Sequence, residues 1–420
     1  MYASDWKCFR NKSSAVRVAF SLIFAILTVL AIIDWNTGGF NGDLSPSNNS
    51  KPCALKMVCY YNFPINSTDL QPEQIPESLC THINLAFAGI NQTDFTIHIP
   101  INDTQLIERI TSLREKNKEL RIIISVGGGR NKDFGKMANT HANRKLFINS
   151  TMKFIKKFEL DGVDIDWEWP GSDGNTKEKI KFIQLLQEFR EEFDRHKKKY
   201  ILSIAAGALE SQVEMYYYVN YIPLYVDFIN LMTYDYHFYT SYYPITDHNA
   251  PLYPSAKDRD SVFAKLNVNY SVNFWIYKSM PREKIILGLP AFGHTYKLIS
   301  SLNHGLHAPA DGFGIGENGF IEYRESCAFL KLLNTFHVRD DDAGVPYAYN
   351  QYDWISFDDV HSIRSKAEFI INEKLGGAMI YSLNAEDYTG VCSTDGTKFP
   401  LLKTVRSVFD GCISKEPEVP

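Results

Sequence analysis

The chain has 420 residues, of which 45% are hydrophobic and 22% are charged, a composition that can fill one large globular domain or two. Its formal net charge is −5 at pH 7 and it has no basic stripe, so nucleic acid is not an expected partner. The aromatic share of 14% suits surfaces that bind sugars, but aromatic rings also fill protein cores, and composition alone does not separate the two.

The N-terminal segment is basic and then apolar. Residues 1–17 carry four basic side chains against one acid, and residues 18–33 form an uncharged apolar run of 16 residues. This run is slightly short for a membrane span and slightly long for the core of a signal peptide. The basic residues before the apolar run favour a signal anchor with a cytoplasmic N-terminus. The alternative is a cleaved signal peptide, for which residues 29–31 offer a cleavage site. We expect a type II membrane-anchored or a secreted protein, with residues 34–52 as a flexible stem.

Cysteines and glycosylation sequons point to the secretory route. The seven cysteines are Cys8, Cys53, Cys59, Cys80, Cys327, Cys392 and Cys412. None forms a C-x-x-C pair, so no zinc site is expected. Six of them follow residue 50, an even number that is consistent with disulfides in an oxidising compartment. Six Asn-x-Ser/Thr acceptors lie downstream of the apolar run: Asn48, Asn66, Asn91, Asn102, Asn149 and Asn269.

From residue 53 onwards, strand-like apolar runs alternate with helical stretches such as Lys177–Arg195. The strand candidates are Met57–Tyr61, His82–Phe87, Arg121–Val126, Gly162–Trp167, Ile201–Ala206, Phe228–Thr233, Lys284–Leu289 and Ala378–Leu383. Eight strands with helical crossovers predict an α/β fold, a (β/α)₈ TIM barrel over residues 53–415. The long gap before the eighth strand predicts an inserted α+β lobe after the seventh, at about residues 295–354.

The most informative stretch is residues 158–170, with the sequence FELDGVDIDWEWP. Asp164, Asp166 and Glu168 stand at i, i+2 and i+4, so in a strand they share one face, and Trp167 faces the other way. Neighbouring carboxylates disfavour each other's ionisation, which raises at least one pKa. A carboxyl group that stays protonated near neutral pH is what cleavage of a glycosidic bond requires. The alternative is a solvated acidic edge strand, which the apolar flanks disfavour.

This run resembles the signature of the family 18 glycoside hydrolases, the chitinases and chitinase-like lectins. Their pattern Asp-x-x-Asp-x-Asp-x-Glu is complete here as Asp161, Asp164, Asp166 and Glu168. The resemblance extends over roughly residues 53–412 and implies catalytic groups at the carboxyl ends of the barrel strands. It implies no cofactor and no metal, and chitin or N-acetylglucosamine oligosaccharides as partners.

Other strand ends resemble the same family. Residues 59–61 (CYY) and 80–89 (CTHINLAFAG) look like paired family segments, which implies a Cys59–Cys80 disulfide and places Tyr60 and Phe87 at the sugar site. That both rings belong to the core is an equally open alternative. Residues 125–128 resemble Ser-x-Gly-Gly, where Gly128 allows close approach of the substrate. Cys327–Cys392 matches a second family disulfide, and Cys53 and Cys412 are left to pair with each other.

Residues 232–235 resemble the family's Met-x-Tyr-Asp, which supplies a phenol and a carboxylate facing the acidic run. The chain also departs from the family pattern. The departures are Gly129-Arg130 where a tryptophan is usual, Phe238 for glycine, Phe292 for tyrosine and Tyr381 for the tryptophan that forms the floor under the sugar. The substrate-binding residues implied by the resemblance are Tyr60, Phe87, Gly128, Trp167, Met232, Asp235 and Tyr381.

The resemblance implies a substrate-assisted, retaining mechanism. Glu168 is the expected general acid, and Asp166 is expected to orient the substrate's acetamide, whose oxygen attacks the anomeric carbon. Tyr234 would donate a hydrogen bond to that oxygen, and Asp164 would share a proton with Asp166. Asp235 would bind the sugar and tune Glu168, whereas Asp161 lies on the opposite parity of the strand and is expected to be structural.

Three functions remain open from the sequence. The first is an endo-acting chitinase on β-1,4-linked N-acetylglucosamine polymers, which the presence of Glu168 favours. The second is a chitin-oligosaccharide lectin without turnover, and the third is a growth-factor-like or structural extracellular protein that has kept the fold. The departures at the aromatic positions indicate lower turnover, or a shift toward shorter or differently linked glycans.

Overall fold

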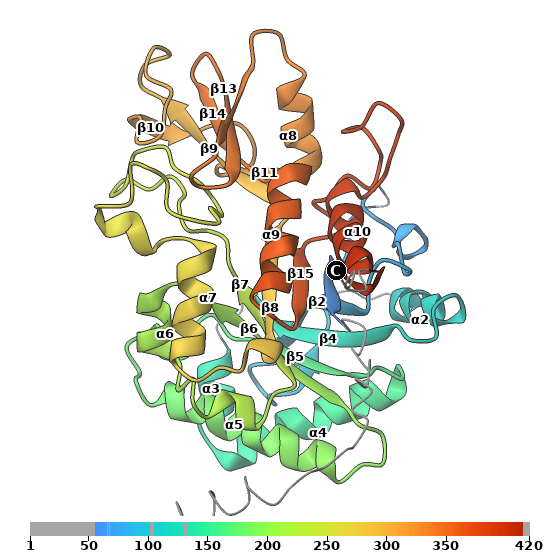
Figure 1. Ribbon diagram of the computed structural model, residues 1–420. Helices are drawn as coiled ribbons and strands as arrows, with labels where there is room; N and C mark the ends of the chain where they lie inside the picture. The colour runs from blue at the N-terminus through green and yellow to red at the C-terminus, as the bar shows by residue number, and fades with distance from the viewer. Residues whose placement is uncertain (1–54, 65, 67, 101–104, 130–132, 415–420) are drawn as a thin grey trace, which may run out of the picture. The chain divides into compact units, whose positions relative to one another are not determined.

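The computed structural model describes residues 55–414 apart from 65, 67, 101–104 and 130–132, and the side chains of 412–414 are not described (Figure 1). The predicted anchor at 18–33, the stem at 34–52 and the proposed Cys53–Cys412 pair therefore lie outside the described residues. Among the helices that are described, none is both long and apolar enough to cross a membrane.

Eight parallel strands close into a barrel, which confirms the predicted TIM fold (Figure 1). They are β1 (Lys56–Asn62), β2 (His82–Ile90), β4 (Arg121–Gly127), β5 (Gly162–Asp166), β6 (Ile201–Gly207), β7 (Phe228–Met232), β8 (Ile285–Pro290) and β15 (Gly377–Tyr381). The hydrogen-bonded order is β1-β15-β8-β7-β6-β5-β4-β2, and pairing of β1 with β2 closes the ring. The short strand β3 (Ile97–His98) pairs antiparallel with the end of β2.

Successive side chains of each barrel strand point alternately into two separate layers of the hydrophobic core, as the two-residue period of a strand requires. Along β1, Met57, Cys59 and Tyr61 pack outward toward the helices. Val58 and Tyr60 belong instead to a separate cluster with Ile123 of β4, Phe228 of β7 and Met379 of β15, which fills the barrel interior.

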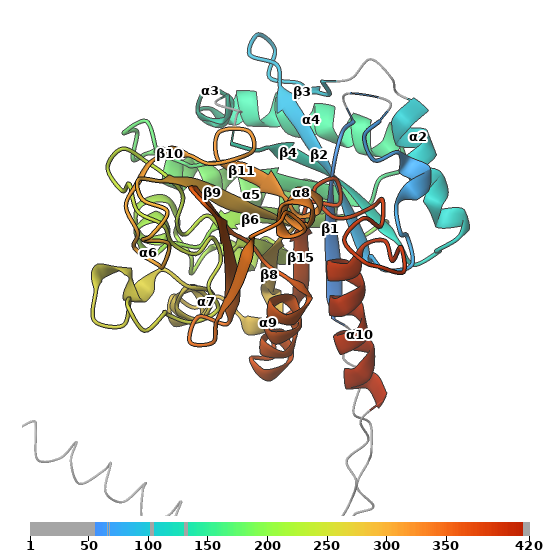
Figure 2. The same cartoon turned by 90° about the horizontal axis from the view of Figure 1, so that it is seen from above.

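Helices connect the strands and cover the outer layer. They are α2 (Gln105–Thr111), α3 (Phe134–Ala138), α4 (His141–Lys157), α5 (Glu178–Asp194), α6 (Glu210–Tyr216), α7 (Val268–Tyr277), α9 (Val360–Asn372) and α10 (Pro400–Ser414). Short 3₁₀ helices lie at Pro72–Gln74, Ser112–Glu115, Ile222–Leu224, Val262–Lys265 and Arg282–Lys284. The helix α5 buries Phe182, Leu186, Phe189 and Phe193, the amphipathic pattern expected for residues 177–195. Helices α9 and α10 pack together beside β15 and β1 (Figure 2).

An antiparallel lobe is inserted between β8 and β15, as predicted (Figure 1). Its sheet has the order β10-β9-β14-β13-β12, with β11 paired to β9. The elements are β9 (Phe292–Leu298), β10 (Ala310–Phe313), β11 (Phe320–Glu322), α8 (Tyr323–Leu330), β12 (Phe336–Asp340), β13 (Val345–Asn350) and β14 (Asp353–Ser356). The lobe sheet runs from 292 to 356, slightly wider than the predicted 295–354.

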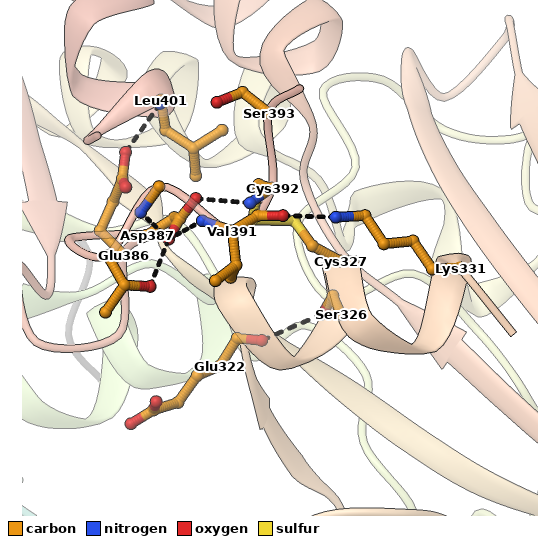
Figure 3. The surroundings of a disulfide bond; sticks show 12 residues. Glu322, Ser326, Cys327, Lys331, Glu386, Asp387, Val391, Cys392, Ser393 and Leu401 are labelled. Atoms are coloured by element: carbon orange, nitrogen blue, oxygen red, sulfur yellow. Dashed lines mark hydrogen bonds between the residues drawn. A yellow bond between two sulfur atoms is a disulfide. The ribbon is translucent and has the colours of Figure 1, made fainter. Parts of the chain in front are cut away.

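Both disulfides implied by the resemblance are present. Cys59 of β1 is joined to Cys80, two residues before β2. Cys327 of α8 is joined to Cys392 in the loop after β15, which ties the lobe to the barrel (Figure 3). Next to this second bridge, the carboxylate of Asp387 accepts hydrogen bonds from the backbone N–H groups of Val391 and Cys392, so the loop is held from both sides (Figure 3).

Asp161 lies one residue before β5, at the opposite end of the strand from Asp166. Its Oδ2 accepts hydrogen bonds from Arg114 at 2.5 Å and from the backbone N–H of Ile122 at 2.9 Å, and Lys198 Nζ lies 3.1 Å from Oδ1. Burial alone would raise the pKa of Asp161, but these partners outweigh it and the pKa is lowered. This buried carboxylate therefore anchors the lower end of the strand.

We predict that Asp161→Asn lowers the free energy of unfolding by about 2 kcal/mol, because a charged acceptor of several hydrogen bonds is lost. Urea denaturation measures the change, with Asp194→Asn, an exposed acid at the end of α5, as the matched control. A variant as stable as the wild type would show that Asp161 has no structural role.

Candidate active site at the carboxyl ends of the barrel strands

A pocket of about 370 Å³ opens at the carboxyl ends of the barrel strands. It is lined by Tyr60, Phe87, Gly129, Asp166, Glu168, Ala205, Met232, Tyr234, Asp235, Phe238, Phe292, His294, Phe320, Met379 and Tyr381. The lining combines aromatic rings with three carboxylates, and it draws on strands of both the barrel and the inserted lobe. The pocket therefore offers stacking surfaces together with groups that can exchange protons.

Asp164 lies beneath this pocket with no exposed surface. Four neutral donors surround its carboxylate: Tyr60 and Ser125 each donate to Oδ2 at 2.7 Å, and Ser203 and Asn230 donate to Oδ1 at 2.7 and 3.1 Å. They come from β1, β4, β6 and β7, so the interior of the barrel converges on this group. Burial raises the pKa of Asp164 in spite of the donors, which stabilise the charged form.

Asp166 and Glu168 form a hydrogen-bonded pair above Asp164. Burial raises the pKa of Asp166 well above its ordinary value, and the charges of Glu168 and Asp164 raise it further. Burial also raises the pKa of Glu168 to about 7, with a further contribution from the charge of Asp235. These raised pKa values favour a proton shared within the pair near neutral pH. The Oδ1 atom of Asp166 is buried and has no hydrogen-bond partner among the described residues.

The end of β5 explains why Glu168 is positioned differently from the two aspartates. Asp166 is the last residue of β5, paired with Gly127 of β4, so Glu168 lies beyond the ladder rather than within it. The predicted strand, Gly162–Trp167, therefore runs one residue too far. A glutamate at this point reaches the pocket from a loop, and its carboxyl lies close to Gly129, where an added Cβ would be 3.6 Å from Glu168 Oε2.

Tyr234 and Asp235 follow β7 and face the acidic pair across the pocket. Burial raises the pKa of Tyr234 well above its ordinary value, so its hydroxyl stays protonated and can donate a hydrogen bond. Asp235 has a φ of 59°, a left-handed conformation that its N–H stabilises by donating to Asn249 Oδ1 at 3.0 Å. Its Oδ1 lies 2.6 Å from His294 Nε2 on β9, which links the pocket to the lobe.

Aromatic rings form the remaining walls. The ring of Tyr381 lies 5.7 Å from that of Tyr60 and 6.2 Å from that of Tyr234. Phe292 stacks on Phe320 of β11 at 4.8 Å. Tyr381 is therefore enclosed by other pocket rings at the position predicted for the floor of the sugar site.

The structure brings most of the predicted residues together. Asp166, Glu168 and Tyr234 line the pocket directly, and Asp164 supports them from below. Of the predicted substrate-binding set, Tyr60, Phe87, Met232, Asp235 and Tyr381 also line it. Gly128 lies just behind the wall, with a φ of 82° and the Phe87 ring 3.1 Å from where a Cβ would stand, so any other residue there would be strained.

Trp167 is the exception, and the prediction that it binds substrate is wrong. Its ring is buried between the barrel and the helices, where it stacks on Phe134 at 5.2 Å and meets the edge of Phe182 at 5.8 Å. The physical reason is the alternation of β5, which turns Trp167 outward when Asp166 points inward.

His294, Phe320, Ala205 and Met379 line the pocket but were not among the predicted site residues. His294 lies two residues after Phe292, a position already named as a departure from the family pattern, so the sequence contained a local signal for it. Phe320 comes from β11 in the lobe and reaches the pocket only because it stacks on Phe292, which no local pattern reveals.

Comparison with known proteins decides the family. Residues 56–386 match the model of glycosyl hydrolases family 18. The chain belongs to glycoside hydrolase family 18. It is 34% identical over 371 residues to mouse (Mus musculus) chitotriosidase-1, covering 84% of this chain and 78% of that protein.

Solved structures of the family include both an enzyme and a binding protein. The group IV chitinase of Ostrinia furnacalis in complex with allosamidin superposes with a TM-score of 0.80 at 31% identity, covering 85% of this chain and 99% of that one. Human YKL-39, described as a pseudo-chitinase that retains chitooligosaccharide binding, superposes with a TM-score of 0.79 at 33% identity, covering 85% and 100%. Membership of family 18 is therefore compatible with turnover and with binding alone.

The electrostatics of the pocket can be tested by titration. Because the charge of Asp235 opposes ionisation of Glu168, we predict that Asp235→Asn lowers the pH at which Glu168 titrates from about 7. Asparagine tolerates the left-handed backbone of this position, so the fold is preserved. Carboxyl ¹³C NMR follows the titration, with the Glu168 signal assigned by its absence in Glu168→Gln.

The control is Asp311→Asn, which removes the same charge from an exposed site in the lobe. It is expected to leave the titration of Glu168 unchanged. A wild-type Glu168 that titrates near the ordinary value for glutamate would contradict the assignment of a raised pKa.

Proposed function

We propose that this protein is an endo-acting chitinase that hydrolyses β-1,4-linked N-acetylglucosamine polymers by a substrate-assisted, retaining mechanism. The observation that carries the proposal is Glu168, a carboxyl group in the pocket whose pKa is about 7 and which is paired with Asp166. A group of this pKa is available in its acidic form at neutral pH, as a general acid must be.

Each neighbouring group has a role in this proposal. Glu168 protonates the glycosidic oxygen as the bond to the leaving sugar breaks, and the substrate's acetamide oxygen attacks the anomeric carbon. Asp166 accepts a hydrogen bond from the acetamide N–H through the oxygen that lacks a partner in the free pocket. Tyr234 donates its hydroxyl hydrogen to the acetamide oxygen, and water then opens the oxazolinium ion with Glu168 as the base. Asp164 stabilises the proton that Asp166 carries during the cycle.

The aromatic surfaces support binding of a polymer rather than a single sugar. Tyr381 and Phe87 present rings in the pocket, 6.4 Å apart. Next to Glu168, the half-buried ring of Trp169 stacks on Tyr216 with the planes 8° apart, which extends the aromatic surface beyond the pocket. Aromatic rings in series suit the apolar faces of consecutive sugars, as an endo-acting enzyme requires.

A binding protein without turnover is the second candidate, and Tyr381 is the observation that favours it. A phenol ring offers a smaller stacking face than the indole usual for the family at this place. The pseudo-chitinase YKL-39 shows that relatives of this similarity bind chitooligosaccharides. Under this alternative the carboxylates persist but the substrate is not held in a reactive position.

The secretory route is part of the proposal. Two disulfides in the described part of the chain fit an oxidising compartment. The sequon asparagines Asn66, Asn91 and Asn149 are exposed, as acceptors of N-glycans must be.

The two candidates are separated by hydrolysis of a fluorogenic N-acetylglucosamine trimer, with wild type and Glu168→Gln compared side by side. We predict release by the wild type and at least a 100-fold lower rate for the variant, because glutamine cannot donate a proton to the leaving oxygen. Calorimetric titration with a chitin tetramer is expected to show similar affinities for both.

Asp311→Asn serves again as a folded control with full turnover. If neither wild type nor Glu168→Gln releases product while both bind the tetramer, the protein is a lectin and the enzyme proposal fails. If neither binds, the pocket is not a chitin site.

A further inference from the structure

Outside the pocket, two histidines and two aspartates converge where the loop between β7 and α7 meets the inserted lobe. His237, Asp247 and Asp258 come from that loop, and His307 comes from the connection between β9 and β10. Asp247 Oδ2 lies 3.4 Å from His237 Nε2 and 3.3 Å from His307 Nε2, and His307 Nε2 lies 2.9 Å from Asp258 Oδ1. Donor atoms of Asp247, Asp258 and His307 all lie within 4.8 Å of one another.

Three of these residues are spaced as the ligands of a metal ion are. With bonds of about 2.0–2.1 Å to nitrogen and oxygen, neighbouring ligand atoms on a zinc tetrahedron are about 3.3 Å apart. His307 Nε2 lies 3.3 Å from Asp247 Oδ2 and 2.9 Å from Asp258 Oδ1, close to that edge length. His237 contacts Asp247 but is not part of the group whose donor atoms all lie within 4.8 Å of one another. One imidazole nitrogen and two carboxylate oxygens, with a fourth position open, are a ligand set that zinc accepts.

The buried carboxylates of the cluster need a positive charge beside them, which either a protonated His307 or a bound cation supplies. Asp247 is 1% exposed and Asp258 is 4% exposed. Asp247 Oδ2 has no hydrogen bond of acceptable geometry among the described residues, although two ring nitrogens lie near it. A buried carboxylate oxygen in this state is costly unless a cation binds it.

The surrounding groups already fix the other atoms of these ligands. Ser255 Oγ donates to Asp258 Oδ2 at 2.7 Å, and the backbone N–H of His248 donates to Asp247 Oδ1 at 2.7 Å. Each aspartate therefore has one oxygen held by a hydrogen bond and turns the other toward the centre. This is the arrangement of outer-shell partners around metal ligands.

We propose that Asp247, Asp258 and His307 form a binding site for a divalent transition-metal ion, zinc in the first place. Nε2 of His307, Oδ2 of Asp247 and Oδ1 of Asp258 are the ligand atoms. The site contains no cysteine, which is why the cysteine spacing gave no indication of it.

The ion would fasten the lobe to the wall of the pocket. His307 N–H already donates to the backbone oxygen of Thr246, and Thr246 N–H donates to that of Ala308, so the two segments run together here. His237 precedes Phe238 and follows Asp235 by two residues, and both neighbours line the pocket. Metal binding is therefore expected to stabilise the fold and to hold this side of the pocket in place.

The test uses the untagged full-length protein, stripped with a chelator and titrated with Zn²⁺ by calorimetry, with metal content measured after dialysis. We expect one zinc per chain and a rise in the thermal unfolding temperature. Asp258→Asn and His307→Gln are each expected to weaken zinc affinity by about 100-fold or more. Asp260→Asn, an exposed acid two residues away, is the matched control and should bind as the wild type does.

The pocket is a competing metal site, because Asp235, His294 and Glu168 also offer metal ligands there. The variant Asp235→Asn tests whether zinc binds in the pocket instead. It should leave zinc binding unchanged, and loss of binding in this variant would place the ion in the pocket and overturn the proposal. Folded wild type that binds no zinc would overturn it as well, leaving the cluster as an ion pair in which His307 carries the positive charge.

A measurement on the wild type alone keeps the test independent of variant folding. Co²⁺ at a four-coordinate site of one imidazole, two carboxylates and a water molecule is expected to give intense visible absorption that one equivalent of Zn²⁺ abolishes. A weak octahedral spectrum, or one that zinc does not displace, would contradict the proposed geometry.

Discussion

The site depends on one constraint, which is that three carboxyl groups are gathered at the end of a single buried strand. Asp164 can be buried because four neutral donors from four different strands surround it. Asp166 and Glu168 lack such a shell, so they satisfy each other by sharing a proton. The difference between these environments separates a supporting aspartate from a pair that can exchange a proton with a substrate.

The barrel and the lobe contribute different parts of this arrangement. The barrel holds the acids rigidly, since Asp164 and Asp166 belong to the β5 ladder itself. The lobe supplies His294 and Phe320, and it is fastened to the barrel by the Cys327–Cys392 disulfide. The acids follow the family signature, whereas the departures from it lie around them: Gly129 after β4, Phe238 in the β7 loop, Phe292 on β9 and Tyr381 at the end of β15. Differences in glycan preference are therefore expected to arise at these positions.

Much of this could be predicted from the sequence because the relevant signals were local. Strand periodicity located all eight barrel strands, and the spacing of Asp164 and Asp166 placed them on the inner face. The same periodicity assigned Trp167 to the opposite face, which should have excluded it from the pocket. The roles of Phe320 and of the cluster around Asp247 and His307 could not be predicted from the sequence, because their members meet only through packing of the lobe on the β7 loop. The shared proton also follows from burial, which a sequence pattern does not measure.

The anomeric configuration of the first product distinguishes the substrate-assisted mechanism from other routes of hydrolysis. A chitin pentamer is mixed with the wild-type protein and the products are followed by ¹H NMR before mutarotation. The account predicts a β anomer at the new reducing end, because two displacements at the anomeric carbon restore its configuration, and no cleavage of cellopentaose, which lacks the acetamide. An α anomer as the first product, or equal cleavage of cellopentaose, would contradict the substrate-assisted mechanism.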